Sequence, residues 1–137
     1  MIITDQRASL YLGNSIDVLK EILPKIDESD KILFWMDSHF PGTDFGLEEK
    51  KYIFDDYNMP LSQELDVIKN YRNTDHDSFI IDDLRLYENG NYQLGDLDIG
   101  REKSGIGFIE NSIKNHLIQR DYRHQGFLIL SLKYCPK

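Results

Sequence analysis

The hydrophobic residues of this chain gather in three short continuous runs, each of which ends at a polar residue. The runs cover residues 32–36, 79–81 and 127–130. Apolar runs of this length, rich in Ile and Phe, are typical of strands buried on both faces of a parallel sheet. We therefore predict three buried strands, with Trp35 packed inside the first. A weaker strand is expected over residues 8–12, and a further short one over residues 1–3.

Helical spacing of apolar residues separates these runs. The first helix is expected to follow residue 13 with Ser15 as its N-cap, because a Ser side chain can accept a hydrogen bond from the first turn. The second begins after Pro60, and its apolar stripe is expected to leave Glu64 outside the core. The third is predicted over residues 108–119, where His116 lies on the apolar face and is expected in the core.

The alternation of strands and helices predicts a three-layer, Rossmann-like α/β fold with a mostly parallel sheet and right-handed crossovers. Residues 1–137 are expected to form a single domain, since a chain of 137 residues suffices for one hydrophobic core. Two long segments, residues 40–58 and 88–107, interrupt the alternation, and each lies beyond a strand that ends in aspartate. Loops of this length in a compact domain commonly carry function.

The charge balance narrows the range of expected partners. The chain has 24 acidic and 16 basic side chains, a formal net charge of −8. A negative field repels phosphate backbones and anionic lipid, so we expect neither nucleic acid nor a membrane surface as a partner. The single cysteine, Cys135, excludes an internal disulfide. No apolar stretch has the length of a signal peptide or a membrane span, and a cytoplasmic protein is expected.

Acidic residues follow two of the predicted strands. Asp37 follows residues 32–36, and Asp82 and Asp83 follow residues 79–81. Parallel α/β sheets bind ligands at the carboxyl ends of their strands, so neighbouring strands would bring these carboxylates together. Two such charges about 5 Å apart repel by roughly 3 kcal/mol at an effective dielectric constant near 20, and a bound cation would offset this. Oxygen ligands favour magnesium, calcium or manganese; alternatively, the acids only cap loops.

Residues near these strand ends supply candidate partners for the acids. His39 could act as a general base. Arg85 could hold an anionic substrate group, or could simply pair with the surplus acid. Gly13, Asn14 and Ser15 lie at a predicted strand-to-helix turn, where backbone N–H groups can receive an anion or the edge of a nucleoside. A tight turn needs such residues in any case, so this signal alone is weak.

Four stretches of the chain resemble one protein family. They are LYLGNS at residues 10–15, LFWMDSHFPG at 33–42, PLSQEL at 60–65 and FIIDDLRLY at 79–87. In this order they are similar to the C-terminal two thirds of class I S-adenosylmethionine-dependent methyltransferases, in particular to a bacterial group with the stretches GDS, FWLDAHYSG, PLLEEL and IDDARLF.

The resemblance implies a truncated methyltransferase-like fold and a set of site residues. Asp37, Asp82 and Asp83 would match the positions that hold magnesium in metal-dependent relatives such as catechol O-methyltransferase. Residues 13–15 would lie near the adenosine half of S-adenosylmethionine. The implied reaction is methyl transfer to a hydroxyl of a small molecule or a sugar. The chain lacks the family's glycine-rich loop after the first strand and the acid after the second, which hold the cofactor.

This difference leaves three explanations open. The chain is a fragment, or a reduced domain in which residues 8–12 pair beside residues 32–36, or a domain whose sheet another chain completes. An exposed edge at the first strand would also allow a homodimer that extends the sheet.

Three functions are compatible with these residues. The first is a methyltransferase-like protein with a magnesium-type acidic site. The second is a non-catalytic binding or assembly module in which the acids cap loops. The third is a different metal-dependent enzyme, such as a hydrolase of phosphate esters, because a fold does not fix the reaction.

Overall fold

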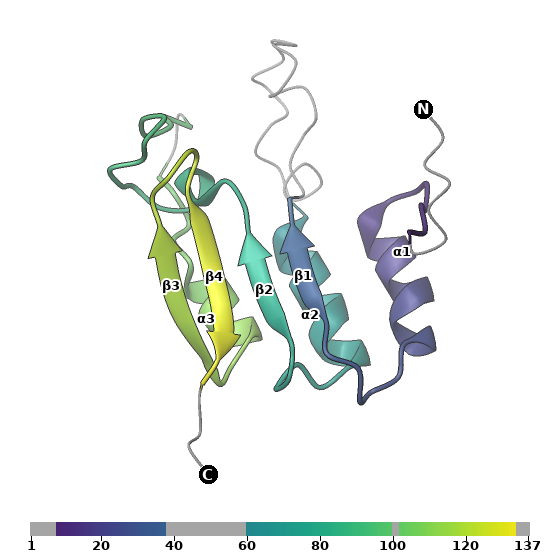
Figure 1. Ribbon diagram of the computed structural model, residues 1–137. Coiled ribbons are helices and arrows are strands. Elements are labelled where there is room, and N and C mark those ends of the chain that lie inside the picture. The colour runs from purple at the N-terminus through teal and green to yellow at the C-terminus, as the bar shows by residue number, and fades with distance from the viewer. Residues whose placement is uncertain (1–7, 38–59, 100–101, 134–137) are drawn as a thin grey trace.

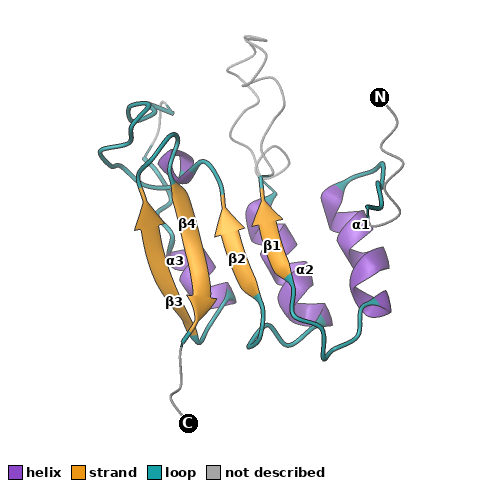
Figure 2. Cartoon of the chain, in the orientation of Figure 1, coloured by secondary structure: helices purple, strands orange, loops and turns teal. Residues whose placement is uncertain are grey.

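The computed structural model describes residues 8–37, 60–99 and 102–133, which form one four-stranded sheet with helices packed against it (Figures 1 and 2). The helices are α1 (Ser15–Ile22), α2 (Leu61–Tyr71) and α3 (Gly107–Ser112), with short 3-10 helices over Leu23–Lys25 and Leu84–Leu86. The strands are β1 (Leu33–Met36), β2 (Ser78–Ile81), β3 (His116–Asp121) and β4 (Phe127–Leu132). Within these described residues, no helix combines the length and the hydropathy that crossing a bilayer requires.

The strands are arranged in the order β1-β2-β4-β3. β1 and β2 pair in parallel, whereas β4 lies antiparallel between β2 and β3. The arrows of β1, β2 and β3 therefore point the same way in Figure 1, and that of β4 points the opposite way. The predicted α/β class is confirmed. The predicted mostly parallel sheet is wrong for the described residues, because a short turn joins β3 to β4 and such a turn makes neighbouring strands antiparallel.

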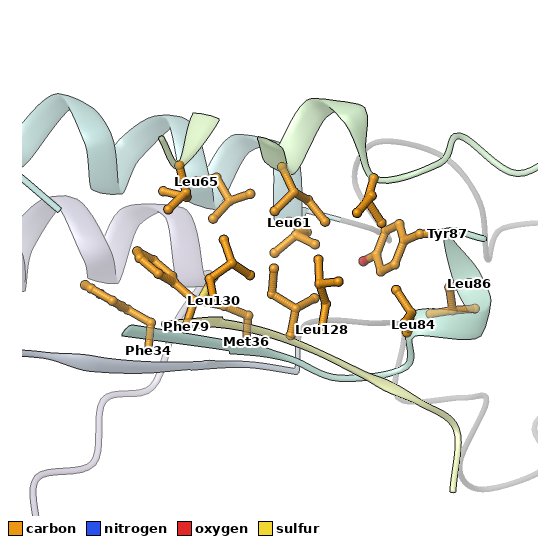
Figure 3. Close-up of a cluster of buried hydrophobic side chains, with 14 of the residues drawn as sticks. Phe34, Met36, Leu61, Leu65, Phe79, Leu84, Leu86, Tyr87, Leu128 and Leu130 are labelled. Atoms are coloured by element: carbon orange, nitrogen blue, oxygen red, sulfur yellow. The ribbon is translucent and has the colours of Figure 1, made fainter. Parts of the chain in front are cut away.

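Helices cover one face of the sheet in the described part of the chain, which therefore has two layers instead of the predicted three (Figure 3). Alternate side chains of β1, β2 and β4 point to these helices and form the core. Members of this core are Phe34, Met36, Phe79, Ile81, Leu128 and Leu130. The intervening side chains lie on the other face, where Trp35 is 57 % exposed. The expectation that Trp35 packs inside a strand buried on both faces is therefore wrong.

Two of the three predicted helices are found where expected. α1 begins at Ser15, but its N-cap is Asn14, whose Oδ1 accepts a hydrogen bond from the N–H of Ile16 at 2.9 Å. α2 begins directly after Pro60, as predicted. Glu64 was expected outside the core but is only 1 % exposed, so this part of the prediction is wrong.

The third helix is shorter than predicted. α3 ends at Ser112, and the second half of the range 108–119 begins strand β3. This segment pairs with β4, and the long-range pairing overrides the helical spacing of its apolar residues. His116 is buried, as predicted, although it lies on a strand. Residues 8–12 form no strand, and the strand predicted over residues 1–3 lies outside the described residues.

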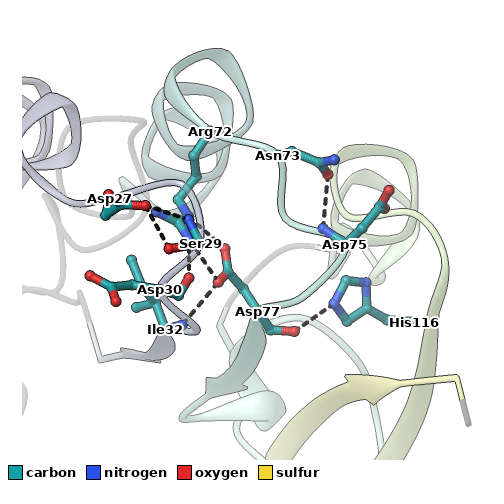
Figure 4. Close-up of polar contacts among 9 residues, drawn as sticks. All are labelled: Asp27, Ser29, Asp30, Ile32, Arg72, Asn73, Asp75, Asp77 and His116. Atoms are coloured by element: carbon teal, nitrogen blue, oxygen red, sulfur yellow. Dashed lines mark hydrogen bonds and ion pairs between the residues drawn. The ribbon is translucent and has the colours of Figure 1, made fainter.

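A buried ion pair joins the helix layer to the edge of the sheet where β1 and β2 begin (Figure 4). Arg72, which ends α2, donates from Nε to Oδ2 of Asp77 at 2.7 Å and from Nη2 to Oδ1 at 3.1 Å. The two side chains are 2 % and 0 % exposed. Asp77 Oδ1 also accepts from the N–H of Ile32 at 2.9 Å, and Arg72 Nη2 donates to the Asp30 carbonyl at 2.7 Å. The pair therefore connects α2, the start of β2 and the segment that enters β1.

His116 extends this polar cluster to β3. Its Nε2 lies 2.8 Å from the Asp77 carbonyl oxygen and its Nδ1 lies 2.7 Å from the Lys114 carbonyl oxygen. A neutral imidazole donates to one of these carbonyls, and a protonated one donates to both. The imidazole thus links the start of β3 to the residue that precedes β2.

Breaking the buried pair is expected to destabilise the fold strongly. Asp77→Asn leaves the Arg72 charge buried without a counter-charge, which should lower the free energy of unfolding by about 3–5 kcal/mol. Urea unfolding followed by circular dichroism measures this change. The matched control is Asp66→Asn, which breaks the exposed pair with Lys69 on the same helix and should cost less than about 1 kcal/mol. Equal effects of the two variants would contradict a structural role for the buried pair.

Candidate functional site

The carboxyl ends of β1 and β2 lie side by side, which is the arrangement that the expected acidic site requires. Met36 pairs with Ile81 in register, and the pairing continues one step further because the Asp82 N–H donates to the Met36 carbonyl at 2.9 Å. Asp37 and Asp82 therefore come directly after paired residues of two neighbouring strands. The backbones of strands paired in this way are about 4.8 Å apart. The structure thus places the backbones of these two predicted site residues at the ends of neighbouring strands.

Continuing the alternation of β1 and β2 by one residue directs Asp37 and Asp82 toward the uncovered side of the sheet. The preceding residues, Met36 and Ile81, are buried beneath the helices, and successive strand residues point to opposite faces. Asp37 is exposed and Asp82 is half-buried, in agreement with this alternation. Asp82 Oδ1 accepts a hydrogen bond from the N–H of Asp83 at 2.7 Å, so one of its oxygens already supports the turn that follows β2.

Asp83 does not join the other two acids. Its backbone adopts the left-handed conformation, with φ 55° and ψ 47°, and its side chain is buried. Asp83 Oδ1 accepts from Nε of Arg85 at 3.2 Å. The structure therefore supports the simpler interpretation of Arg85, which pairs with an acid of its own loop.

The hairpin between β3 and β4 holds this turn in place. The N–H groups of Leu84 and Arg85 donate to the carbonyls of Gly126 and Gln125, at 2.9 Å and 3.2 Å. Gly126 has a φ of 86°, and a Cβ at this position would lie 2.3 Å from the ring of Tyr92. Only glycine fits there without displacing the ring, so the hairpin can approach closely and fix the path of the chain after Asp82.

The N-terminus of α1 lies at the same end of the molecule as the carboxyl ends of β1 and β2, because α1 runs opposite to β1 (Figure 1). The turn at residues 13–15 therefore lies at the same end of the molecule as Asp37 and Asp82, where a ligand-binding role would require it. The Asn14 side chain is the helix cap, so the part of this turn that can receive a ligand is its backbone. A Cβ on Gly13 would lie 3.3 Å from Val18 Cγ2, so larger residues are crowded at this turn.

Glu64 is a charged residue near this edge that the sequence analysis placed wrongly. It lies in the first turn of α2, where a carboxylate is favoured by the helix dipole. Burial raises the pKa of Tyr87, and the negative charges of Glu64 and Asp83 raise it further. The signal was present in the sequence: Glu64 follows Leu61 by three residues and precedes Ile68 by four, which places it on the apolar face of α2.

A three-carboxylate metal site is not formed by the described residues. Among residues 8–37, 60–99 and 102–133, no group of three or more His, Cys, Asp or Glu side chains could hold a metal ion. Asp37 and Asp82 provide two carboxylates, which suffice for Mg²⁺ when water and substrate complete its shell. His39, the predicted base, lies outside the described residues, as does the whole segment 40–58.

A separate cleft of about 340 Å³ is formed by the long segment after β2. It is lined by Asn89, Asp96, Leu97, Asp98, Ile99, Glu102 and Lys103. None of the predicted site residues lines this cleft. Lys103 donates to Asp96 and thereby offsets part of the acidic charge there.

Comparisons with known proteins do not identify a family. No protein-family model matches the chain, no curated protein matches it, and no solved structure matches its fold.

The buried Tyr87 gives the fold a predictable response to alkali. Its pKa is raised above the ordinary value of 10.0, chiefly by burial, so the phenol stays protonated in the folded chain when it ionises in the unfolded one. Its stabilising contribution is complete below about pH 10 and decreases as the pH rises above that value. In that range the free energy of unfolding of wild type should therefore fall with pH more steeply than that of Tyr87→Phe. The difference should be up to about 1.4 kcal/mol per pH unit.

Urea unfolding of both proteins between about pH 9 and pH 11 tests this expectation. Tyr71→Phe, the same substitution at a more exposed tyrosine, is the control. Identical pH profiles for wild type and Tyr87→Phe would show that burial does not raise the pKa of Tyr87.

Proposed function

We propose that this chain is a methyltransferase-like domain that binds a divalent cation and S-adenosylmethionine at the carboxyl edge of β1 and β2. The observation that carries the proposal is the parallel, in-register pairing of these strands, which sets Asp37 beside Asp82. The α1 N-terminus at the same edge supports it (Figure 1). This arrangement follows the order of stretches on which the resemblance to the methyltransferase family rests.

The two neighbouring carboxylates suit magnesium. They repel each other, and a small, hard cation that keeps several waters offsets this repulsion without further protein ligands. A bound magnesium ion would orient a substrate hydroxyl and lower its pKa. In the proposed reaction, that oxygen attacks the methyl carbon of S-adenosylmethionine, and the bond between this carbon and the sulfur breaks to release S-adenosylhomocysteine.

Each predicted site residue has a proposed part. Asp37 and Asp82 hold the cation, and His39 takes the hydroxyl proton. Arg85 fixes Asp83 in the turn after β2, so we assign it a positioning role. The backbone around residues 13–15 contacts the nucleoside. The proposed substrate is a small molecule or sugar hydroxyl, and a net charge of −8 argues against a polyanionic one.

A second candidate function rests on the local contacts of the acids. Asp82 accepts from the Asp83 N–H, and Asp83 pairs with Arg85. Both contacts are those of residues that cap a loop, which is the expectation for a non-catalytic binding or assembly module. The two functions differ in whether Asp37 and Asp82 bind a cation and a cofactor.

Titration calorimetry with S-adenosylmethionine, S-adenosylhomocysteine and magnesium chloride distinguishes these functions. We expect wild-type protein to bind magnesium and S-adenosylhomocysteine. Asp37→Ala should weaken magnesium binding at least tenfold, or about 1.4 kcal/mol. Gly13→Val should weaken binding of the nucleoside because it crowds the α1 turn against Val18. Asp66→Ala, which removes an exposed acid from α2, is the control and should leave both affinities unchanged.

The other outcomes decide against the proposal. Magnesium binding without cofactor binding would favour a different metal-dependent enzyme, such as a phosphate-ester hydrolase. Absence of both would favour the non-catalytic module. A ligand of the folded state must raise the melting temperature, so a thermal shift with the same ligands provides an independent check.

A further inference from the structure

The sheet has an open position beside β1, which we call the acceptor position. Among the described residues β1 has one neighbour, β2, and lies at the end of the sheet. The carbonyls of Ile32 and Met36 face β2, since they accept from the N–H groups of Ser78 and Asp82. Backbone groups alternate along a strand, so the N–H and C=O of the intervening Leu33 and Trp35 face the acceptor position. An edge with outward-facing groups of this kind is a template for another strand.

Helix α1 provides an apolar surface against which a strand at the acceptor position could pack. It packs against α2 and lies beyond β1, as Figure 1 shows. α1 is amphipathic, yet none of its residues is fully buried, and its apolar Ile16 and Leu19 are only partly covered. Leu33 and Trp35 are also exposed at this end of the sheet. A strand added beside β1 would cover the remaining apolar surface of α1 and the flank of these two side chains.

The chain itself contains a segment with the properties of such a strand, residues 8–12, which we call the donor segment. Its sequence, ASLYL, predicts a strand, but the structure places it outside the sheet. Leu10 is 81 % exposed and Leu12 is fully exposed. The donor segment therefore leaves apolar side chains in water, while the acceptor position leaves backbone groups without a strand partner in the described part of the chain. Every copy of the chain carries one of each.

We propose that two copies of this chain form a dimer in which the donor segment of each copy adds as a strand to β1 of the other. The exchange satisfies the outward backbone groups of Leu33 and Trp35 and buries Leu10 and Leu12. A reciprocal exchange is closed, so it ends at two copies. The copies carry a net charge of −8 each, so association should strengthen when salt screens their repulsion. This inference is independent of the proposed methyltransferase function.

Size-exclusion chromatography with light scattering tests the exchange in the full chain. Wild-type protein should have twice the mass of the chain, and the dimer fraction should increase with salt concentration. Leu33→Pro removes an N–H that faces the acceptor position at the first residue of an edge strand, where proline is tolerated. It should give a monomer. Leu33→Val keeps the N–H and should remain a dimer.

A donor variant keeps the test decisive if proline perturbs folding. Leu10→Asp with Leu12→Asp changes two exposed side chains, so it should preserve the circular dichroism spectrum and yield a monomer. A wild-type monomer at high micromolar concentration would overturn the proposal. A dimer that persists in the donor variant would also overturn it, because the contact would then lie elsewhere. A monomer whose Leu33 and Trp35 amides resist hydrogen exchange would show instead that the donor segment pairs within its own copy.

Discussion

The placement of the candidate site depends on the buried ion pair between Arg72 and Asp77. Asp77 immediately precedes β2 and also accepts from the N–H of Ile32, which precedes β1. The pair therefore sets the register of β1 against β2 at the start of both strands, and this register carries Asp37 to Asp82 at their other end. Taking two charges out of water is costly, so the net stability gained from such a pair is small compared with the cost of breaking it.

The same pair leaves one polar atom without compensation. Arg72 Nη1 is buried and has no hydrogen-bond partner among the described residues, while Nε and Nη2 bond to Asp77 and Asp30. An orphaned donor lowers the net gain from the pair. The guanidinium is buried in spite of this. Its burial agrees with an ion pair whose main effect is to hold α2, β1 and β2 in one arrangement. Only with these three elements fixed do the acids at the opposite edge acquire a defined geometry.

The elements whose apolar pattern is local and unambiguous could be predicted from the sequence. The runs around Phe34, Phe79 and Leu128 became strands, and the stripe after Pro60 became α2. The range 108–119 failed because its spacing fits a helix, whereas its pairing with β4 depends on residues far along the chain. The prediction that both faces of the sheet are covered was wrong for a related reason. A continuous apolar run does not reveal whether anything packs on its other side.

The candidate site was predictable in part. That Asp37 and Asp82 lie at neighbouring strand ends follows from two strands that are each followed by aspartate and that pair in parallel. That Asp83 turns away follows from a left-handed residue held by the β3–β4 hairpin, and no local pattern signals this contact. The spacing of Glu64 from Leu61 and Ile68 indicates the apolar face of α2, although carboxylates are usually exposed. The errors therefore concern where turns and distant segments direct a side chain.

The central claim is that the β1–β2 register creates a cation site at Asp37 and Asp82. The most direct measurement is paramagnetic broadening of backbone amide signals by Mn²⁺, an oxygen-seeking stand-in for magnesium, in isotope-labelled protein. The account predicts that substoichiometric Mn²⁺ first broadens the amides of Met36, Asp37, Asp82 and Asp83. Broadening that begins instead at the acidic cleft around Asp96 and Asp98, or that is uniform over the surface, would contradict it.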